Sequence, residues 1–593
     1  MQDNGLIQEL PLSIPFFRGQ VETFLRESGL RMEELDHYYA FTSPDGSILA
    51  GAGIRADIIK CVAVAPSARS EGLMLPLLSR IVSDAAAKGI LNLKVFTKPE
   101  NQEIFESIGF KVLASAPKAI LMENGRGLEK YCEYLHCQRK PDARKCGVIV
   151  MNANPFTLGH KYLIDKALEQ VDRLFVIPVK EDASAFPYLE RLAMIRAHAD
   201  ARITVLEGSD YCISAATFPT YFLKDLSDAA ETQMTLDIDL FERHIMPALG
   251  ATVRFVGSEP LDPLTARYNA LMHNAVVIPR LTAVMPDTDR ASAQPSAEQN
   301  YFSGRCPKNQ FSSANASPAR ADAVSASRVR AAIEAGDYAS AAALCPVTTH
   351  PYLLAALAER ALLMELNTPG KPGLVGPDGS GAHKDMDYDT MLRGIKALRP
   401  FWSRMAMASG PDKLRELGIE AEKAMLSATG GVNTHRGAIF CLGIALNAAE
   451  AWRQQTDIQQ IMQKRVKEIA HPLLHNQLKN NNLAPRREGV KDARAMALDG
   501  YSDLFTDWLP FYREAEQDAL QKTLLRIIST LDDTCVIKRV GYDRAQEVKR
   551  EANASPTLAD AIEDMCIRYA QEGISPGGAA DMLALTIFFD SII

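Results

Sequence analysis

Residues 146–168, CGVIVMNANPFTLGHKYLIDKAL, combine a short apolar run, a polar turn and a helical pattern. The apolar run, residues 146–151, predicts a short buried strand that ends in a polar turn at residues 152–155. Apolar positions then recur at helical spacing over residues 158–171, and a second apolar strand follows at 174–179. A strand-loop-helix-strand order predicts a parallel sheet, whose ligands bind at the carboxyl ends of the strands.

The segment Thr157-Leu-Gly-His160 (TxGH) opens this predicted helix. Backbone N–H groups and the helix dipole favour a phosphate at such a position. His160, on the first turn, would donate to phosphate oxygens during attack on the α-phosphorus of ATP, and Gly159 leaves room for the nucleotide. Taken alone, the motif fits a capped helix with a surface histidine equally well.

A second segment with the residue types of a phosphate site lies far downstream. Val324-Ser-Ala-Ser-Arg-Val-Arg330 (SxSxxVR) precedes a helix predicted at residues 331–335. Hydroxyls and arginines at a helix N-terminus suit the β- and γ-phosphates of ATP. The predicted contacts are Ser325, Ser327, Arg328 and Arg330.

The length of 593 residues predicts roughly three to four domains. Residues 1–125 indicate a mixed α and β domain, and residues 140–345 a second one. Residues 286–324 are rich in Ser, Ala, Pro, Asn and Gln, which predicts a mobile insertion in the second domain. Helical spacing dominates residues 350–593, which predicts an all-α domain.

The composition excludes several classes of protein. Hydrophobic residues at 47% and charged residues at 23% are ordinary for a globular chain, and a net charge of −8 disfavours a nucleic-acid binder. No signal peptide and no apolar segment long enough for a membrane span are evident, so no membrane partner is expected. Ten cysteines without a CxxC pair indicate reduced thiols and a cytoplasmic protein.

TxGH followed by SxSxxVR resembles the nucleotidyltransferase superfamily, which has a Rossmann-like α/β fold. The words NANPFTLGHKYLI, GSDYCISAATFPTYFLK (208–224) and RFVGSEPLDPLTARYN (254–269) are similar to the citrate lyase ligase. The resemblance implies that acetate is activated by ATP and Mg²⁺ as acetyl-adenylate. The acetyl group then passes to the thiol of the citrate lyase acyl carrier subunit. Further ATP contacts would be Asn154 and Thr157, with Lys161 and Lys224 as counter-charges.

Residues 1–125 resemble the GNAT-like acetyltransferase fold that begins the same ligases. Arg69-x-x-Gly72 precedes a predicted helix, where backbone amides would meet the pyrophosphate of coenzyme A or a carrier's pantetheine arm. Met74 stands where that superfamily usually has glycine or alanine. This difference favours arm docking or a structural role over an independent acetyltransferase.

The C-terminal region contains five short sequence motifs, most of them turn-rich and charged: KPGLV from Lys371, GAHKDMD from Gly381, TGGVNTHRG from Thr429, LDDT from Leu531 and SPGGAAD from Ser575. Aspartate pairs supply the hard oxygen ligands of Mg²⁺ carrying a triphosphate, although each pair could instead cap a helix. The predicted metal ligands are Asp385, Asp387, Asp532 and Asp533.

These words resemble triphosphoribosyl-dephospho-CoA synthase over nearly the whole region. The resemblance implies that the 2'-hydroxyl of dephospho-CoA displaces adenine from ATP. The phosphate and ATP contacts would be Lys371, Lys384, Gly430, Gly431, Asn433 and Arg436. The proton-transfer candidates are His383 and His435.

Two other functions stay open at this point. TxGH alone also fits an adenylyltransferase of the phosphopantetheine type. A nucleotide- or CoA-binding regulatory scaffold with inactive sites is the alternative from another class.

Overall fold

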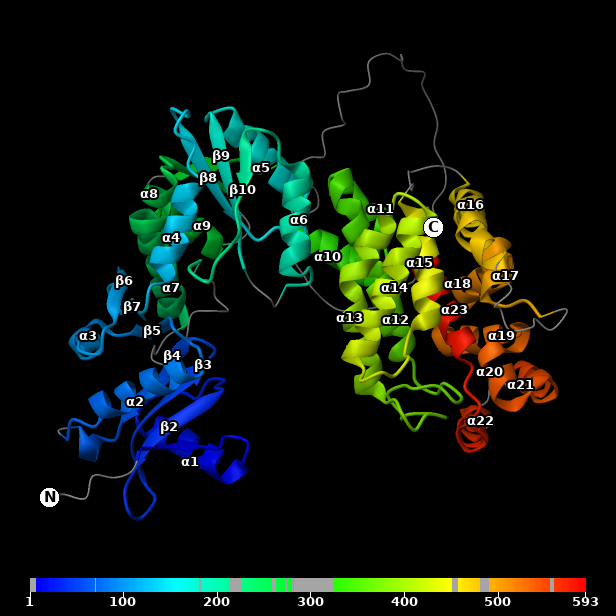
Figure 1. The fold of residues 1–593 in the computed structure, drawn as a ribbon, viewed down its shortest axis with the longest axis horizontal. Coiled ribbons are helices and arrows are strands. Elements are labelled where there is room, and N and C mark those ends of the chain that lie inside the picture. Colours follow the sequence, from blue (N-terminus) through cyan, green and yellow to red (C-terminus); the bar gives the residue numbers. More distant parts are fainter. Residues whose placement is uncertain are drawn as a thin grey trace. The chain divides into compact units, whose positions relative to one another are not determined.

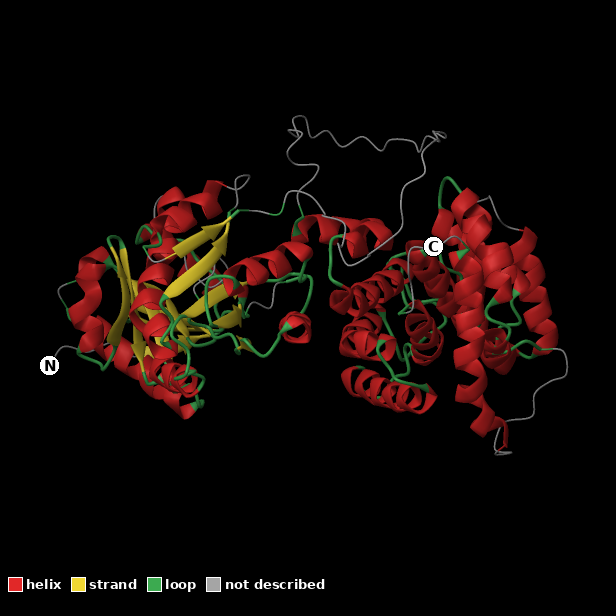
Figure 2. Ribbon diagram, turned by 90° about the horizontal axis from the view of Figure 1, so that it is seen from above, coloured by secondary structure: helices red, strands yellow, loops and turns green. Residues whose placement is uncertain are grey.

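The computed structural model describes residues 7–69, 71–180, 184–212, 226–258, 263–273, 275–279, 281, 324–450, 457–479, 490–554 and 559–593. Except for Val324, the predicted insertion 286–324 lies outside these residues, as does Lys224. The chain forms two compact units, of which the first contains 1–153 with 159–323 and the second 154–158 with 324–593. The described strands all belong to the first unit, and the second unit is built from helices (Figures 1 and 2).

The first unit begins with a seven-stranded sheet of order β1-β2-β3-β4-β5-β7-β6. Its strands pair antiparallel except for β4 and β5, which run parallel. The strands are β1 (Ile7–Leu10), β2 (His37–Thr42), β3 (Ile48–Arg55), β4 (Ile58–Val64), β5 (Leu93–Thr97), β6 (Lys111–Ala116) and β7 (Ala119–Asn124).

Helices pack on both faces of this sheet. Because side chains alternate along a strand, Tyr38 of β2 packs with Phe24 of α1 (Pro15–Glu27), and the adjacent Tyr39 packs in the other core with Leu77 of α2 (Met74–Ala87). The short helix α3 (Gln102–Glu106) follows β5. These elements agree with the mixed α and β character predicted for residues 1–125.

The second sheet has five parallel strands in the order β10-β9-β8-β11-β12. Its strands are β8 (Cys146–Met151), β9 (Arg173–Pro178), β10 (Ile203–Val205), β11 (Val253–Gly257) and β12 (Ala275–Ile278). The predicted parallel sheet is therefore confirmed. The strand order reverses beside β8, and ligands of open parallel sheets bind at such a reversal. The TxGH loop leaves the carboxyl end of β8 at this point.

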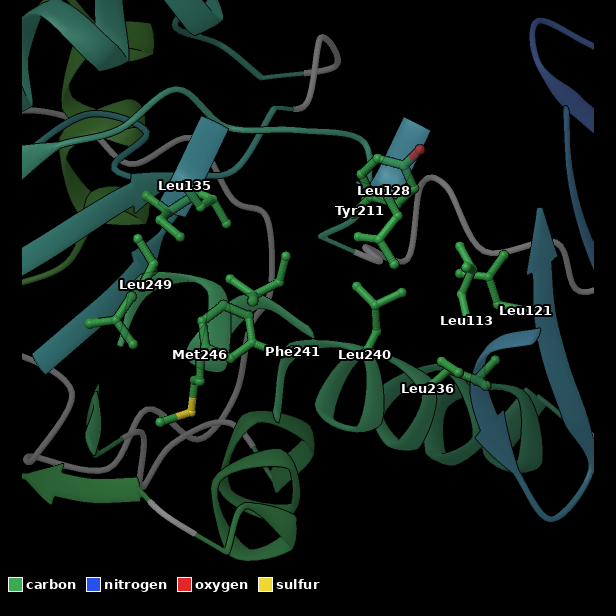
Figure 3. Packing of buried hydrophobic residues seen from close by; sticks show 14 of the residues in the cluster. Leu113, Leu121, Leu128, Leu135, Tyr211, Leu236, Leu240, Phe241, Met246 and Leu249 are labelled. Atoms are coloured by element: carbon green, nitrogen blue, oxygen red, sulfur yellow. The ribbon is translucent and has the colours of Figure 1, made fainter. Parts of the chain in front are cut away.

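The two sheets share a core. Leu113 and Leu121 of the first sheet lie in one buried cluster with Leu236 and Leu240 of α7 (Leu226–Leu240) and with Tyr211 (Figure 3). The other helices of the second sheet region are α4 (Gly127–Cys137), α5 (Leu158–Leu168), α6 (Tyr188–His198), α8 (Met246–Leu249) and α9 (Pro263–Leu271), with a π-helical turn at Phe241–Ile245. The first unit is thus one continuously packed body.

The second unit is helical, as predicted for residues 350–593. Its helices are α10 (Ala326–Ala335), α11 (Tyr338–Ala343), α12 (His350–Leu366), α13 (Tyr388–Ala406), α14 (Pro411–Ala428), α15 (Arg436–Ala449), α16 (Ile458–Lys479), α17 (Ala493–Leu498), α18 (Leu509–Glu514), α19 (Ala519–Thr530), α20 (Thr534–Val540), α21 (Tyr542–Ala554), α22 (Ala559–Glu572) and α23 (Gly577–Ile592). Helices α12 and α23 are apolar on most sides because the others surround them. None of the described helices has the length and apolarity that crossing a membrane requires.

Candidate active sites

The TxGH loop and the SxSxxVR helix are in direct contact. Arg330 Nη1 donates to the carbonyl oxygen of Asn154 at 2.6 Å across 176 positions of sequence. Its Nη2 donates to Ser327 Oγ at 3.1 Å. Ser325 Oγ caps α10 by accepting the backbone N–H of Arg328. The structure therefore brings together the two segments predicted to share a phosphate site, and Arg330 connects them by a hydrogen bond.

Two further hydrogen bonds fix the same loop to the helices that follow α10. The backbone N–H of Leu158 donates to Leu344 O at 2.9 Å, and Thr349 Oγ1 donates to Phe156 O at 2.9 Å. Thr157 is buried between these points. Residues 154–158 thus belong to the second unit, although the strand before them and the helix after them belong to the first.

His160 lies on the first turn of α5, half-buried, in the first unit together with Gly159. Burial lowers the pKa of His160 to about 4. At neutral pH the ring is therefore neutral and carries one N–H donor. The neighbouring Lys161 forms an ion pair with Asp165 on the same helix, Nζ to Oδ2 at 2.8 Å, so its charge is already balanced.

A cleft of about 550 Å³ opens at the carboxyl ends of the parallel strands β4 and β5. Arg69 and Met74 line it from the chain that follows β4, and Thr97 and Asn101 line it from the chain that follows β5. Gly72 lies between the two former residues in the sequence, while Ser70 is outside the described residues. The predicted arm-docking residue Arg69 therefore does face a cleft.

In the helical unit, Lys371 is almost completely buried and already paired. Its Nζ donates to Glu365 Oε1 at 2.6 Å and to Glu365 O at 2.8 Å, and both side chains are shielded from water. A direct contact between Lys371 and a phosphate would require this pair to open, because the amine already has two strong acceptors.

Asp533 joins the N-termini of two helices. Its Oδ1 caps α20 by accepting the N–H of Cys535 at 2.8 Å, and its Oδ2 accepts the N–H of Ala579 on the first turn of α23 at 2.9 Å. Asp581, also on α23, accepts the N–H of Ala438 on α15. The words LDDT, SPGGAAD and THRG therefore meet where three helices begin.

Asp581 and Glu365 were not among the predicted site residues. Burial, followed by repulsion from Asp533 and Glu365, raises the pKa of Asp581 well above its usual value. Perturbed acids of this kind concentrate at functional sites. A signal was present, because Asp581 ends the Gly-rich word SPGGAAD, but a local motif does not show which acids lie near one another.

The other predicted aspartates have separate local partners. Asp387 caps α13 by accepting the N–H of Thr390 at 2.8 Å, and Asp532 pairs with Lys549 at 2.9 Å. Asp385 is 68% exposed, with its Oδ1 3.8 Å from Nδ1 of His383. In the part of the chain that the structure describes, no three His, Cys, Asp or Glu side chains could hold a metal together. The four aspartates are thus not gathered into one ligand set, and their metal role stays a prediction.

The two histidines of this unit differ in their surroundings. His383 Nε2 is 2.8 Å from Ser575 Oγ, and burial and Arg539 lower its pKa. His435 is buried, with Nδ1 2.8 Å from Thr434 Oγ1, and among the described residues its Nε2 has no hydrogen-bond partner. Burial, then the charge of Lys371, lowers the pKa of His435 to about 3.

The TGGVNTHRG loop leads directly into α15. Gly430 and Gly431 have φ values of +68° and +92°, which only glycine adopts without strain, and a Cβ on either would meet open space. Asn433 Oδ1 accepts the N–H of Arg436 at 3.1 Å, and the Arg436 guanidinium pairs with Glu422. Lys384 is exposed. An open Gly-rich turn before a helix suits a phosphate, as predicted.

Protonation of His435 is expected to destabilise the helical unit. The unfolded state binds this proton near pH 6.5 and the folded state only near pH 3, so the free energy of unfolding should fall as the pH drops through that window. The loss amounts to at most about 4–5 kcal/mol. Urea unfolding at several pH values should show that the free energy of unfolding of His435→Asn depends less on pH than that of the unaltered chain. The same substitution at exposed His273 should leave this pH dependence unchanged. Equal pH dependence of His435→Asn and the unaltered chain would contradict the burial argument.

Comparison with known proteins separates the chain into two parts. The family model "Citrate lyase ligase C-terminal domain" matches residues 146–298, and "ATP:dephospho-CoA triphosphoribosyl transferase" matches residues 351–593. The "[Citrate [pro-3S]-lyase] ligase" of Haemophilus influenzae is 42% identical over 281 residues, which are 44% of this chain and 84% of that protein. The protein of the same name from Escherichia coli is 37% identical over 338 residues, 56% of this chain and 89% of that protein.

The C-terminal part has relatives of its own. The "2-(5''-triphosphoribosyl)-3'-dephosphocoenzyme-A synthase" of Pectobacterium atrosepticum is 32% identical over 255 residues, which are 38% of this chain and 84% of that protein. The chain belongs to both families. The citrate lyase ligase half therefore contains the TxGH loop, and the triphosphoribosyl-dephospho-CoA synthase half contains the buried polar group around Lys371, Asp533 and Asp581.

Proposed function

We propose that the chain is a bifunctional enzyme of citrate lyase maturation. The ligase half joins acetate to ATP as acetyl-adenylate, releases diphosphate, and passes the acetyl group to the thiol of the citrate lyase acyl carrier subunit with release of AMP. The hydrogen bond between Arg330 and Asn154 supports this most strongly, because it joins the SxSxxVR helix to the loop that leads into the TxGH motif.

Each ligase residue has a role that its surroundings allow. The neutral ring of His160 donates an N–H to oxygens of the α-phosphate, where charge builds up as the carboxylate attacks. Arg328 and Arg330, with Ser325 and Ser327, bind the β- and γ-phosphates that leave as diphosphate. Asn154, Thr157 and Gly159 are the further contacts that we propose for the nucleotide.

The synthase half forms 2'-(5''-triphosphoribosyl)-3'-dephospho-CoA. The 2'-hydroxyl of dephospho-CoA attacks the ribosyl C1 of ATP and the C1–N bond to adenine breaks. The hydroxyl proton passes to a base, and an acid supplies a proton to the ring nitrogen of the departing adenine. His383, which is half-buried beside Ser575 and Asp385, and the buried His435 are the candidates for proton transfer. The Gly430-Gly431 turn with Asn433, Lys384 and Arg436 receives the triphosphate.

Magnesium would neutralise the triphosphate in both reactions. The described residues build no complete protein cage, which fits the usual binding of Mg²⁺ by one or two carboxylates, substrate phosphates and water. The exposed carboxylate of Asp385 is the best placed for this role.

We also propose a fold family for each domain. We assign a GNAT-like domain to residues 1–125, a Rossmann-like nucleotidyltransferase domain to 140–345 and an all-α synthase domain to 350–593. The cleft lined by Arg69 receives the pantetheine arm of the carrier subunit. A cytoplasmic location agrees with the free thiols of the described cysteines.

Two incubations of the full-length chain test the function. ATP with dephospho-CoA should release adenine, and ATP with acetate and thiol-form carrier subunit should release AMP, both followed by chromatography. ATP with 4'-phosphopantetheine is the third arm. Consumption of ATP only in this third arm would favour the phosphopantetheine-type adenylyltransferase, and binding of ATP without any product would favour the regulatory scaffold.

A further inference from the structure

Helix α6 begins where three neighbouring parallel strands end. Strands β10, β9 and β8 are adjacent in the second sheet, and their carboxyl ends carry the loops that a ligand of the sheet would touch (Figure 1). Resting on the proposed ligase activity, we propose that Arg191 of α6 is a positioning residue, which fixes the loops after β8 and β9 so that the nucleotide site is preformed.

Arg191 is completely buried and spans two of these loops. Its Nη1 donates to Asn152 O at 2.8 Å and to Asn152 Oδ1 at 2.9 Å, just after β8, and to Val179 O at 2.8 Å, just after β9. Its Nε donates to Phe186 O at 3.0 Å, which ties the segment before α6 to the same side chain. Asn152 begins the polar turn that runs into the TxGH segment.

The third loop is held from the same helix. The hydroxyl of Tyr188 accepts the N–H of Gly208 at 2.7 Å, just beyond β10, and the Arg191 guanidinium lies 5.7 Å from the centre of the Tyr188 ring. Only glycine fits at position 208, because a Cβ there would lie 2.1 Å from the carbonyl oxygen of Pro178 at the end of β9. Gly208 is the first residue of the segment GSDYC, which has no role in either of the two proposed reactions.

A guanidinium is suited to this position and an ammonium is not. The planar fork of arginine presents donors in several fixed directions, whereas lysine presents one compact centre on a flexible stem. Taking a cation out of water is costly unless its donors are satisfied, so Arg191 and the carbonyl oxygens around it hold one another in place. Lysine has no second donor at the position of Nε, so Arg191→Lys would leave Phe186 O without this donor and would let the single ammonium shift among the acceptors at Asn152 and Val179.

The test is the full-length Arg191→Lys variant. We expect kcat for AMP formation to fall about 100-fold and KM for ATP to rise. A small misplacement of a reacting group lowers the rate by about this factor. Adenine release by the synthase half should stay within about twofold and serves as the internal control. Arg202→Lys is the matched control, because Arg202 is 51% exposed and its Nη1 lies 3.5 Å from Leu168 O at the end of α5. This variant should behave as the unaltered chain.

Tyr188→Phe is the second variant, which removes only the oxygen that accepts the Gly208 N–H. A drop of about 3- to 10-fold in kcat for AMP formation with little change in Tm is expected, in proportion to one lost hydrogen bond. If Arg191→Lys lowers Tm while the folded fraction keeps the kcat and KM of the unaltered chain, the side chain only stabilises the fold and the proposal is wrong. Should Arg191→Lys not fold, unchanged kinetics in Tyr188→Phe would overturn it. Absence of AMP from the unaltered chain would instead refute the ligase activity.

Discussion

Replacing His160 by alanine is expected to lower AMP formation by about 10²–10³-fold and to leave adenine release unchanged. Loss of one preorganised donor to a developing negative charge has about this cost. The low pKa of His160 means that the neutral ring is the active species at neutral pH, so the donor is one N–H rather than a full positive charge. AMP and adenine are measured chromatographically in parallel incubations of the same preparation.

Two variants sharpen this prediction. His160→Asn keeps an N–H donor on a shorter side chain and should retain more AMP formation than His160→Ala. His273→Ala, at a side chain that is 82% exposed in the same unit, should have no effect on either product. Loss of both products in His160→Ala would show that the two activities do not have separate active sites.

Replacing Asp385 by alanine should abolish most adenine release, by about 10²-fold or more, while AMP formation continues. The carboxylate is 68% exposed and caps no helix, so its removal should leave Tm nearly unchanged. A ligand to Mg²⁺ carrying the triphosphate contributes several kcal/mol to the transition state, which is the basis of the expected loss. A titration with Mg²⁺ should show a higher requirement in Asp385→Ala.

The matched control is Asp389, which lies two residues beyond the GAHKDMD segment. Asp389→Ala removes an exposed carboxylate from the first turn of α13 and should keep adenine release within about threefold, as expected of a surface substitution. Unaltered adenine release and Mg²⁺ dependence in Asp385→Ala would remove Asp385 from the metal site. The same loss in both variants would indicate general repulsion between this loop and the triphosphate rather than metal binding.

Much of the local structure was predictable because it depends on short-range patterns. An apolar run that ends in Asn-Ala-Asn-Pro predicts β8 with the bounds observed, Cys146–Met151, and the start of α5 at Leu158. Ser325 and Asp387 were placed at helix entrances, and each caps the helix that follows it. In such cases the side chain and its partner lie within about one helical turn, so sequence spacing specifies their contact.

The candidate sites were predictable only in part. The words TxGH and SxSxxVR indicated two halves of a phosphate site, and Arg330 does bond to Asn154. In contrast, the four aspartates were predicted as one metal set, yet Asp532 pairs with Lys549 and Asp533 caps two helices. A carboxylate serves equally well as metal ligand, ion-pair partner or helix cap, and only its neighbours in space distinguish these roles.

Short-range patterns were enough to predict β8, the start of α5 and the helical character of residues 350–593, and the long motifs indicated two joined enzymes. The contacts of Arg191 with the loops after β8 and β9, the pairing of Lys371 with Glu365 and the nearness of Asp581 to Asp533 are visible only in the folded chain. The physical reason is that hydrophobic periodicity and capping act over one or two turns of chain. A buried charge, by comparison, must find its partners across elements that are brought together by packing alone.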